Sequence, residues 1–119
     1  MHLEIHRQIE DDPRLREEWN GLVEQLDQPQ IFYTWQWAKA MEVAYRTVRP
    51  PWLALAREGA ALVGVAALAI QGSRAEFLTS TTADYCDFLG TPGRRAELID
   101  AVFTVLRKAG WLPKATVGS

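Results

Sequence analysis

The residues best suited to chemistry lie together in the run Asp84-Tyr85-Cys86-Asp87, which brings two carboxylates, a phenol and a thiol close together in the chain. A carboxylate at a strand edge can act as a general base or bind the amine of a substrate. Asp84, Tyr85 and Asp87 are therefore candidate substrate-binding residues. The alternative is structural: Asp84 shapes a turn, while Cys86 and Phe88 alternate into the core.

The thiol of Cys86 has no obvious catalytic or metal-binding partner. It is the single cysteine of the chain, and the two histidines, His2 and His6, lie at the far end of the sequence. A lone cysteine forms no internal disulfide, and this spacing fits no zinc pattern. Without a neighbouring histidine the thiol also lacks an activating base. The sequence predicts neither a metal site nor a cysteine nucleophile.

A glycine turn, Gly90-Thr91-Pro92-Gly93-Arg94-Arg95, leads into the last expected helix. Backbone N–H groups at a helix start, together with two guanidiniums, can bind a phosphate. Gly93, Arg94 and Arg95 are therefore candidate cofactor-binding residues. Pro92 removes one donor N–H, and glycine turns are common before helices, so an ordinary turn is the alternative.

Two aromatic residues, Tyr33 and Trp35, stand at the start of another expected helix and could line a substrate groove. The chain has five tryptophans. Trp19, Trp37 and Trp111 occupy positions where a core residue is expected, so we interpret most of them as packing residues.

The first half of the chain predicts a strand and two helices. Residues 3–9 alternate as a strand, and Asp12 with Pro13 is typical of a helix start. The first helix turns one apolar face to the core, made of Leu15, Trp19, Leu22, Val23 and Leu26. A second helix follows a cap at Thr34 and ends before Pro50, and its expected buried face is Trp37, Met41, Ala44, Tyr45 and Val48.

The second half changes to an extended pattern. Residues 52–56 and 61–70 predict a hairpin, and residues 75–79 and 85–89 two further strands. A last helix spans 94–109, and another strand begins at Trp111. The order is β-α-α-β-β-β-β-α-β. It predicts one α+β domain over residues 1–119, a mixed and mostly antiparallel sheet with helices on its faces, whose last strand is cut short.

Composition excludes several classes of protein. The net charge is -2, with 13 basic and 15 acidic residues, and no basic cluster suits a nucleic-acid surface. The N-terminus lacks the apolar run of a signal peptide. The longest apolar stretch, 60–70, is about half the ~20 residues of a membrane-spanning helix. We therefore expect a cytoplasmic protein that binds no nucleic acid and inserts into no membrane.

Several short motifs, in order along the chain, resemble the first half of the CelD/BcsL-like (BioF2-like) acyltransferases, which are related to the FemAB peptidyl transferases. They are Trp19-x-x-Leu22, Pro29-x-x-Phe32 leading to Trp35-x-Trp37 and Tyr45, Leu62-Val63-Gly64-Val65-x-x-Leu68, and Asp84-Tyr85-x-Asp87. Together they cover nearly the whole chain. Ala67 departs from the family pattern, which tends to have proline there.

The resemblance implies a GNAT-like half domain. Full-length members have two such halves and transfer an acyl group from coenzyme A, or an aminoacyl group from tRNA, to an amine or hydroxyl, many of them in cell-envelope or exopolysaccharide synthesis. Acetyl-CoA or another acyl-CoA would then be a co-substrate rather than a permanently bound cofactor. The pyrophosphate motif [QR]-x-x-G-x-[GA] typical of GNAT enzymes is absent from this sequence.

The resemblance therefore predicts an N-terminal part that is inactive alone and needs a second GNAT-like half or a homodimer partner. The alternatives are a non-catalytic binding module, with an exposed sheet edge over residues 111–117, and an idle truncated fragment.

Overall fold

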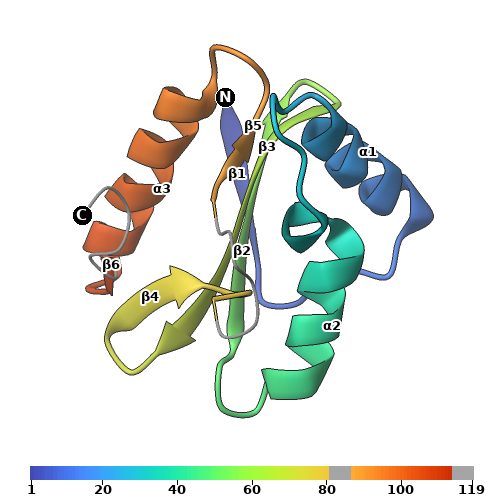
Figure 1. Ribbon diagram of the computed structural model, residues 1–119. Coiled ribbons are helices and arrows are strands. Elements are labelled where there is room, and N and C mark those ends of the chain that lie inside the picture. Colours follow the sequence, from blue (N-terminus) through green and yellow to red (C-terminus); the bar gives the residue numbers. More distant parts are fainter. Residues whose placement is uncertain (81–86, 114–119) are drawn as a thin grey trace.

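One open sheet forms the centre of the protein (Figure 1). The computed structural model describes residues 1–80 and 87–113. The sheet has six strands in the order β1-β2-β3-β4-β6, with β5 also paired to β3. All pairs are antiparallel except β4 with β6. The strands are β1 (His2–His6), β2 (Pro51–Glu58), β3 (Ala61–Gln71), β4 (Arg74–Phe77), β5 (Leu89–Gly90) and β6 (Leu112–Pro113).

Helices lie on both faces of this sheet. Helices α1 (Pro13–Glu24) and α2 (Trp35–Tyr45) cover one face, and α3 (Arg95–Lys108) covers the other (Figure 1). A short 3-10 turn, η1 (Ile31–Tyr33), precedes α2. The α+β class, the mostly antiparallel sheet and the order of the elements are confirmed.

The central strands supply apolar side chains to two separate cores. In β2, Leu53 and Leu55 belong to the core under α1 and α2, whereas Trp52, Ala54 and Ala56 belong to the core under α3. Strand side chains alternate between the two faces, so a strand covered on both sides is apolar at nearly every position. This explains why the sequence of β2 and β3 is so continuously hydrophobic.

The helix starts follow the capping signals of the sequence. The Asp12 carboxylate accepts a bond of 2.9 Å from the Arg14 N–H, and Pro13 is the first residue of α1. The Thr34 hydroxyl accepts from the Trp37 N–H at 3.3 Å. Each cap satisfies an N–H group that has no partner within the helix.

The buried face of α2 differs from the expected one. Its buried residues are Trp35, Ala38 and Glu42, whereas Val48 lies beyond the helix and is 63% exposed. Glu42 tolerates burial because its carboxylate pairs with the Lys39 ammonium at 2.7 Å and accepts a hydrogen bond from the Ile9 N–H. Of the expected face, Met41 does pack against the core, but Ala44 and Val48 are exposed, so the expectation was wrong for these two residues.

The first strand is also shorter than expected. It ends at His6, and Ile9 lies in the core under α1 and α2 rather than in the sheet. Both backbone groups of Ile9 are bound by α2, since its N–H donates to Glu42 and its carbonyl accepts from Lys39. These bonds replace the sheet bonds that a longer strand would have formed.

Candidate functional site

Strand β3 changes partner along one of its edges, and the change opens the sheet. Residues 68–71 of β3 pair with β4, whereas Gly64 and Val65 pair with β5. The Ala67 carbonyl still accepts a bond of 3.0 Å from the Leu78 N–H, just beyond the end of β4. Strand β5 begins at Leu89, on the same edge of β3. The two short strands therefore meet β3 in succession and leave a break between them.

A small pocket lies at this break, on the side of the sheet covered by α1 and α2. Its volume of about 20 Å³ suits one water-sized group. The two alanines facing it, Ala38 from α2 and Ala67 from β3, are small and leave this room open. Its lining also includes Trp19, Phe32, Tyr33, Val65, Phe77, Thr79, Asp87 and Leu89.

Two of the candidate substrate-binding residues, Tyr33 and Asp87, come together at this pocket. Tyr33 is held from α1, because the Trp19 indole N–H donates to the Tyr33 carbonyl at 2.9 Å. Trp19 itself is fully buried. Tyr33 from η1 and Asp87 from the segment before β5 therefore border the same space, although they lie far apart in the sequence.

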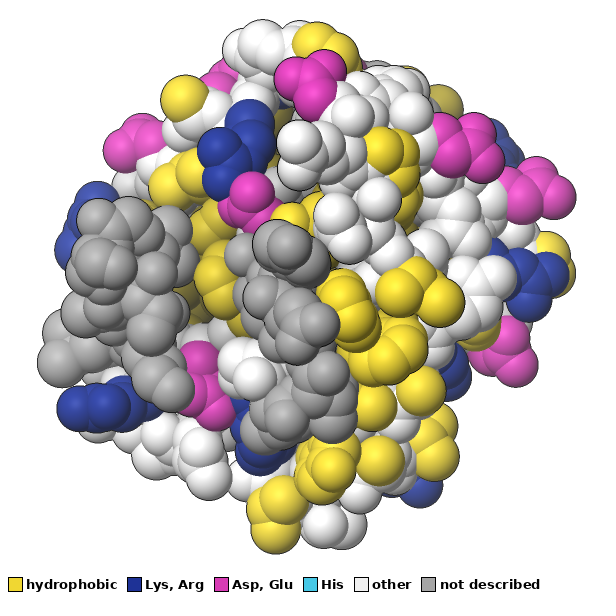
Figure 2. Space-filling view, in the orientation of Figure 1, with side chains coloured by type: hydrophobic (Ala, Val, Ile, Leu, Met, Phe, Trp, Pro, Cys, Tyr) yellow, Lys and Arg dark blue, Asp and Glu magenta, His cyan; other side chains and the backbone are white. Residues whose placement is uncertain are grey.

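The Asp87 carboxylate is oriented by two donors. Its Oδ1 accepts from the Phe88 N–H at 2.8 Å and also from the Arg95 guanidinium at the start of α3. The side chains of Asp87 and Arg95 are 38% and 47% exposed. Asp87 therefore borders the pocket, and its side chain remains in reach of solvent. Figure 2 shows the protein in the orientation of Figure 1, and on this side basic and acidic side chains lie beside exposed hydrophobic ones.

The neighbouring guanidinium, Arg94, is engaged by two carboxylates. It contacts Glu58 at 2.7 Å and Glu97 at 2.8 Å. The hydrogen bonds that Arg94 donates to Glu97 and Glu58 raise the pKa of Arg94 above its ordinary value. The hydrogen bond and charge of Arg94, with the N-terminal ammonium, lower the pKa of Glu58. Both arginines of the candidate phosphate site are thus paired with acidic groups of the chain itself.

The glycine turn borders a second, separate recess. Gly93, with a φ of 85°, and Arg95 line it together with Asp27 and the turn residues Gly90, Thr91 and Pro92. Its volume is about 240 Å³. A phosphate there would meet the Asp27 carboxylate as well as Arg95, so the charges of this recess are mixed. A cofactor-binding role for Gly93, Arg94 and Arg95 stays a prediction.

Trp35 lies inside the core between α1 and α2. It is 6% exposed, and the Arg16 guanidinium lies 5.5 Å from the centre of its ring. The Asn20 side chain accepts from the Trp35 backbone N–H and donates to Gln36. The indole Nε1 of Trp35 is buried without a hydrogen-bond partner in the described chain. The ring of Trp35 packs in this core, and a substrate-binding role for it stays a prediction.

No sequence pattern pointed to Arg49, which holds the backbone of one wall of the pocket. Arg49 is 4% exposed although it precedes two prolines in a connecting segment. Its guanidinium pairs with Glu76 at 2.6 Å and donates to the Phe77 and Leu78 carbonyls and to the Ser80 hydroxyl. These bonds hold the backbone around the pocket residues Phe77 and Thr79. The role of an arginine at this position becomes visible only in the contact between residue 49 and the distant segment 76–80.

Two candidate residues, Asp84 and Tyr85, lie outside the described residues. Within residues 1–80 and 87–113, no three acidic, histidine or cysteine side chains gather as a metal site would require. Across the same ranges, no helix is both long and apolar enough to cross a membrane.

Comparisons with family models, with curated proteins and with solved structures give no match to this chain.

The site therefore offers a carboxylate, Asp87, and a phenol, Tyr33, beside a small apolar space at a break in a sheet. A carboxylate in this position can accept a proton from an amine or hydroxyl, and a phenol can donate a hydrogen bond. The apolar wall can receive a small group such as a methyl.

Proposed function

We propose that this chain is the N-terminal part of an acyltransferase of the GNAT superfamily, which transfers an acyl group from coenzyme A to an amine or hydroxyl. The observation that carries the proposal is the break in the sheet beside β3, with Tyr33 and Asp87 on one pocket. The order of the elements and the mostly antiparallel sheet agree with it. An acceptor in cell-envelope or exopolysaccharide synthesis belongs to the same proposal and rests on the sequence resemblance.

The roles of the two side chains follow from the chemistry of acyl transfer. The thioester C–S bond breaks, a C–N or C–O bond forms, the nucleophile loses a proton, and coenzyme A leaves as a thiolate that takes up a proton from water. Asp87 accepts that proton, while Arg95 and the Phe88 N–H keep its carboxylate oriented. Tyr33 supplies a phenol near the reacting carbonyl. The pocket volume of about 20 Å³ suits the methyl of an acetyl group.

The pocket receives only the reacting end of such a donor. The remainder of coenzyme A needs a longer surface, which a second GNAT-like half or a homodimer partner would complete. We therefore expect the chain alone to bind an acyl-CoA weakly and to transfer no acyl group.

The test is thermal unfolding with and without an excess of acetyl-CoA. At about 100 times its dissociation constant, a ligand adds roughly 2.7 kcal/mol, which is a shift of several degrees for a domain of this size. We expect a shift that shrinks in Asp87→Asn and Tyr33→Phe. Asp100→Asn on α3 is the matched control, because Asp100 is exposed and lies outside the pocket. A cooperatively melting protein without any shift would overturn the acyltransferase proposal.

A non-catalytic binding module is the second candidate. It is favoured by the pairing of Arg94 with Glu58 and Glu97, and of Arg95 with Asp87. Both guanidiniums already have carboxylate partners, so neither needs a phosphate as its counter-charge. In that case acetyl-CoA should give no shift in any variant, and the same pairs would serve only to fix the start of α3.

A further inference from the structure

The strand β1 forms one edge of the sheet. Its only strand partner in the described chain is β2, to which all its residues from His2 to His6 are paired. No hydrogen bond to the outer edge of β1 is found from any other part of residues 1–80 and 87–113. An edge strand of this kind presents a row of backbone donors and acceptors that can pair with another strand.

The two faces of β1 have opposite character. Leu3 and Ile5 lie opposite Ala56 and Ala54, whose side chains belong to the core under α3. Ile5 is nevertheless 41% exposed, because no other strand of the described chain covers that side. The apolar layer between the sheet and α3 therefore ends at an open border.

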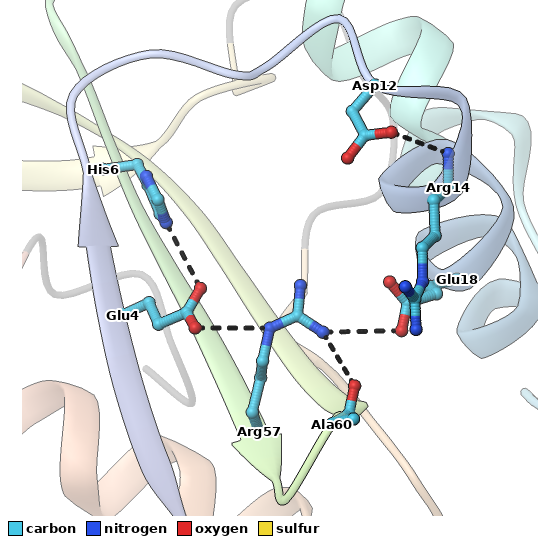
Figure 3. Close-up of polar contacts among 7 residues, drawn as sticks. All are labelled: Glu4, His6, Asp12, Arg14, Glu18, Arg57 and Ala60. Atoms are coloured by element: carbon cyan, nitrogen blue, oxygen red, sulfur yellow. Dashed lines mark hydrogen bonds and ion pairs between the residues drawn. The ribbon is translucent and has the colours of Figure 1, made fainter.

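The other face of β1 is charged and points toward α1 (Figure 3). The Glu4 carboxylate contacts Arg57 at 3.4 Å and His6 at 3.4 Å. Arg57 also contacts Glu18 of α1 at 3.4 Å and donates to the Ala60 carbonyl. The Glu4 side chain is thus held by Arg57, and it lies on a strand whose other edge is open.

The sequence of this edge is complementary to itself when it runs antiparallel. A pairing centred on Leu3 places Leu3 against the partner's Leu3 and Ile5 against the partner's Met1. On the other face it places His2 against the partner's Glu4, twice by symmetry. Every apolar side chain then faces an apolar one, and every carboxylate faces an imidazole, which are favourable cross-strand pairs.

Neighbouring registers lack this match. A pairing centred on Glu4 would place two Glu4 carboxylates directly opposite, which is destabilising. A pairing centred on Ile5 would keep Glu4 opposite the partner's His6 but would place the charged Arg7 against the apolar Leu3 of the partner. Symmetric dimers require one surface that complements itself, and only the Leu3-centred register meets this condition with both faces.

We propose that β1 pairs antiparallel with β1 of a second copy of this chain, so that two sheets join into one across a two-fold axis at Leu3. The joined edge covers Ile5 and continues the apolar layer under α3 into the partner. A strand of this length buries little area, so the dimer is weak and depends on concentration. The proposal is independent of the acyltransferase activity.

The first test is sedimentation over a concentration series. We expect the mass to rise from 13.4 kDa toward twice that value as concentration increases. His2→Glu places a carboxylate opposite the partner's Glu4 and should lower association at least tenfold. Gln28→Glu introduces a carboxylate at an exposed position in the segment after α1 and should leave association unchanged. A monomer at every concentration would overturn the proposal.

The second test fixes the register by disulfide formation, with Cys86→Ser as background. Leu3→Cys places two thiols directly opposite at the two-fold axis, where Cβ atoms of paired strands are close enough to bridge. We expect rapid cross-linking of Leu3→Cys and little of Ile5→Cys, with both variants folded by circular dichroism. Faster cross-linking of Ile5→Cys, or equal rates in both, would rule out the Leu3-centred pairing.

Discussion

At the scale of single residues, we expect the buried guanidinium of Arg49 to contribute strongly to the free energy of unfolding. It is almost fully enclosed, and its donors reach the Glu76 carboxylate, two backbone carbonyls and the Ser80 hydroxyl. A charge in such a place is tolerable only when every donor is satisfied. Loss of the guanidinium would leave the Glu76 carboxylate, 13% exposed, without this counter-charge.

We therefore predict that Arg49→Met lowers the free energy of unfolding by about 3–5 kcal/mol, the usual cost of removing one member of a buried ion pair. Urea unfolding measures this change. Arg74→Met, in the same strand as Glu76 but exposed, is the matched control and should change stability by less than about 0.5 kcal/mol. Equal effects of the two substitutions would show that the Arg49 contacts contribute little.

The second prediction concerns Glu4 and acid pH. Partial burial raises its pKa, but the hydrogen bond from His6 and the Arg57 guanidinium outweigh burial, so that the pKa lies below its ordinary value of 4.5. A carboxyl with a lower pKa in the folded state stabilises the protein above 4.5, and this contribution is lost as the pH falls further.

Glu4→Gln should therefore lower the melting temperature at neutral pH and make its decline toward about pH 3 shallower than in the wild type. Glu17→Gln, an exposed change of the same kind on α1, serves as the control and should follow the wild-type curve. Parallel curves for wild type and Glu4→Gln would contradict the link between Glu4 and Arg57.

At the scale of elements, close contact of α3 with the sheet depends on Gly64. A Cβ at this position would lie 3.0 Å from Leu98 Cδ2 and 3.3 Å from the Ala56 Cβ. Leu98 is fully buried and has little space to move. The absence of a side chain at Gly64 thus sets how near α3 approaches β3.

We predict that Gly64→Ala destabilises the protein by about 1–3 kcal/mol through overpacking. Gly21→Ala offers the opposite case, since Gly21 lies in α1 and a Cβ there meets nothing within 4 Å. That change should stabilise by about 0.5–1 kcal/mol through helix propensity. Thermal unfolding of both variants checks the pair, and a stabilised Gly64→Ala would show that Leu98 repacks freely.

The elements also show how far sequence patterns reach. Their order was predictable because strand and helix periods are local, and the caps at Asp12 and Thr34 involve neighbouring residues. The buried face of α2 was not predictable, because the buried Glu42 is stabilised by a hydrogen bond from the backbone N–H of Ile9, far away in the chain. Local patterns predict an element, but only tertiary contacts decide which side of it is covered.

The candidate site divides in the same way. Tyr33 and Asp87 were found as residue types near the ends of elements, and the structure brings them to one pocket. The pairing of Arg94 with Glu58 could not be foreseen, because Glu58 is the last residue of β2, far from Arg94 in the chain. No sequence pattern predicts the burial of Arg49, since a single arginine before two prolines resembles an exposed loop residue.

At the scale of the whole molecule, one sheet is shared by two cores. Leu22 of α1 and Leu106 of α3 lie in different cores, on opposite faces, and both are buried. Strands β2 and β3 supply side chains to each core, so neither helical layer can detach without exposing the sheet that the other layer needs. The two layers should therefore unfold as one unit.

The last prediction tests this coupling. Leu22→Ala and Leu106→Ala should each cost about 2–5 kcal/mol, as leucine truncations in a core do. In urea, each variant should keep a single transition whose slope matches the wild type, when followed by far-ultraviolet circular dichroism and by tryptophan fluorescence. Trp19 reports on the core with Leu22, and Trp52 on the core with Leu106.

If Leu106→Ala shifted the circular dichroism transition while the fluorescence transition split into two steps, α3 would unfold separately from α1 and α2. Coincident transitions in both variants would mean that the cooperative unit is the whole three-layered domain.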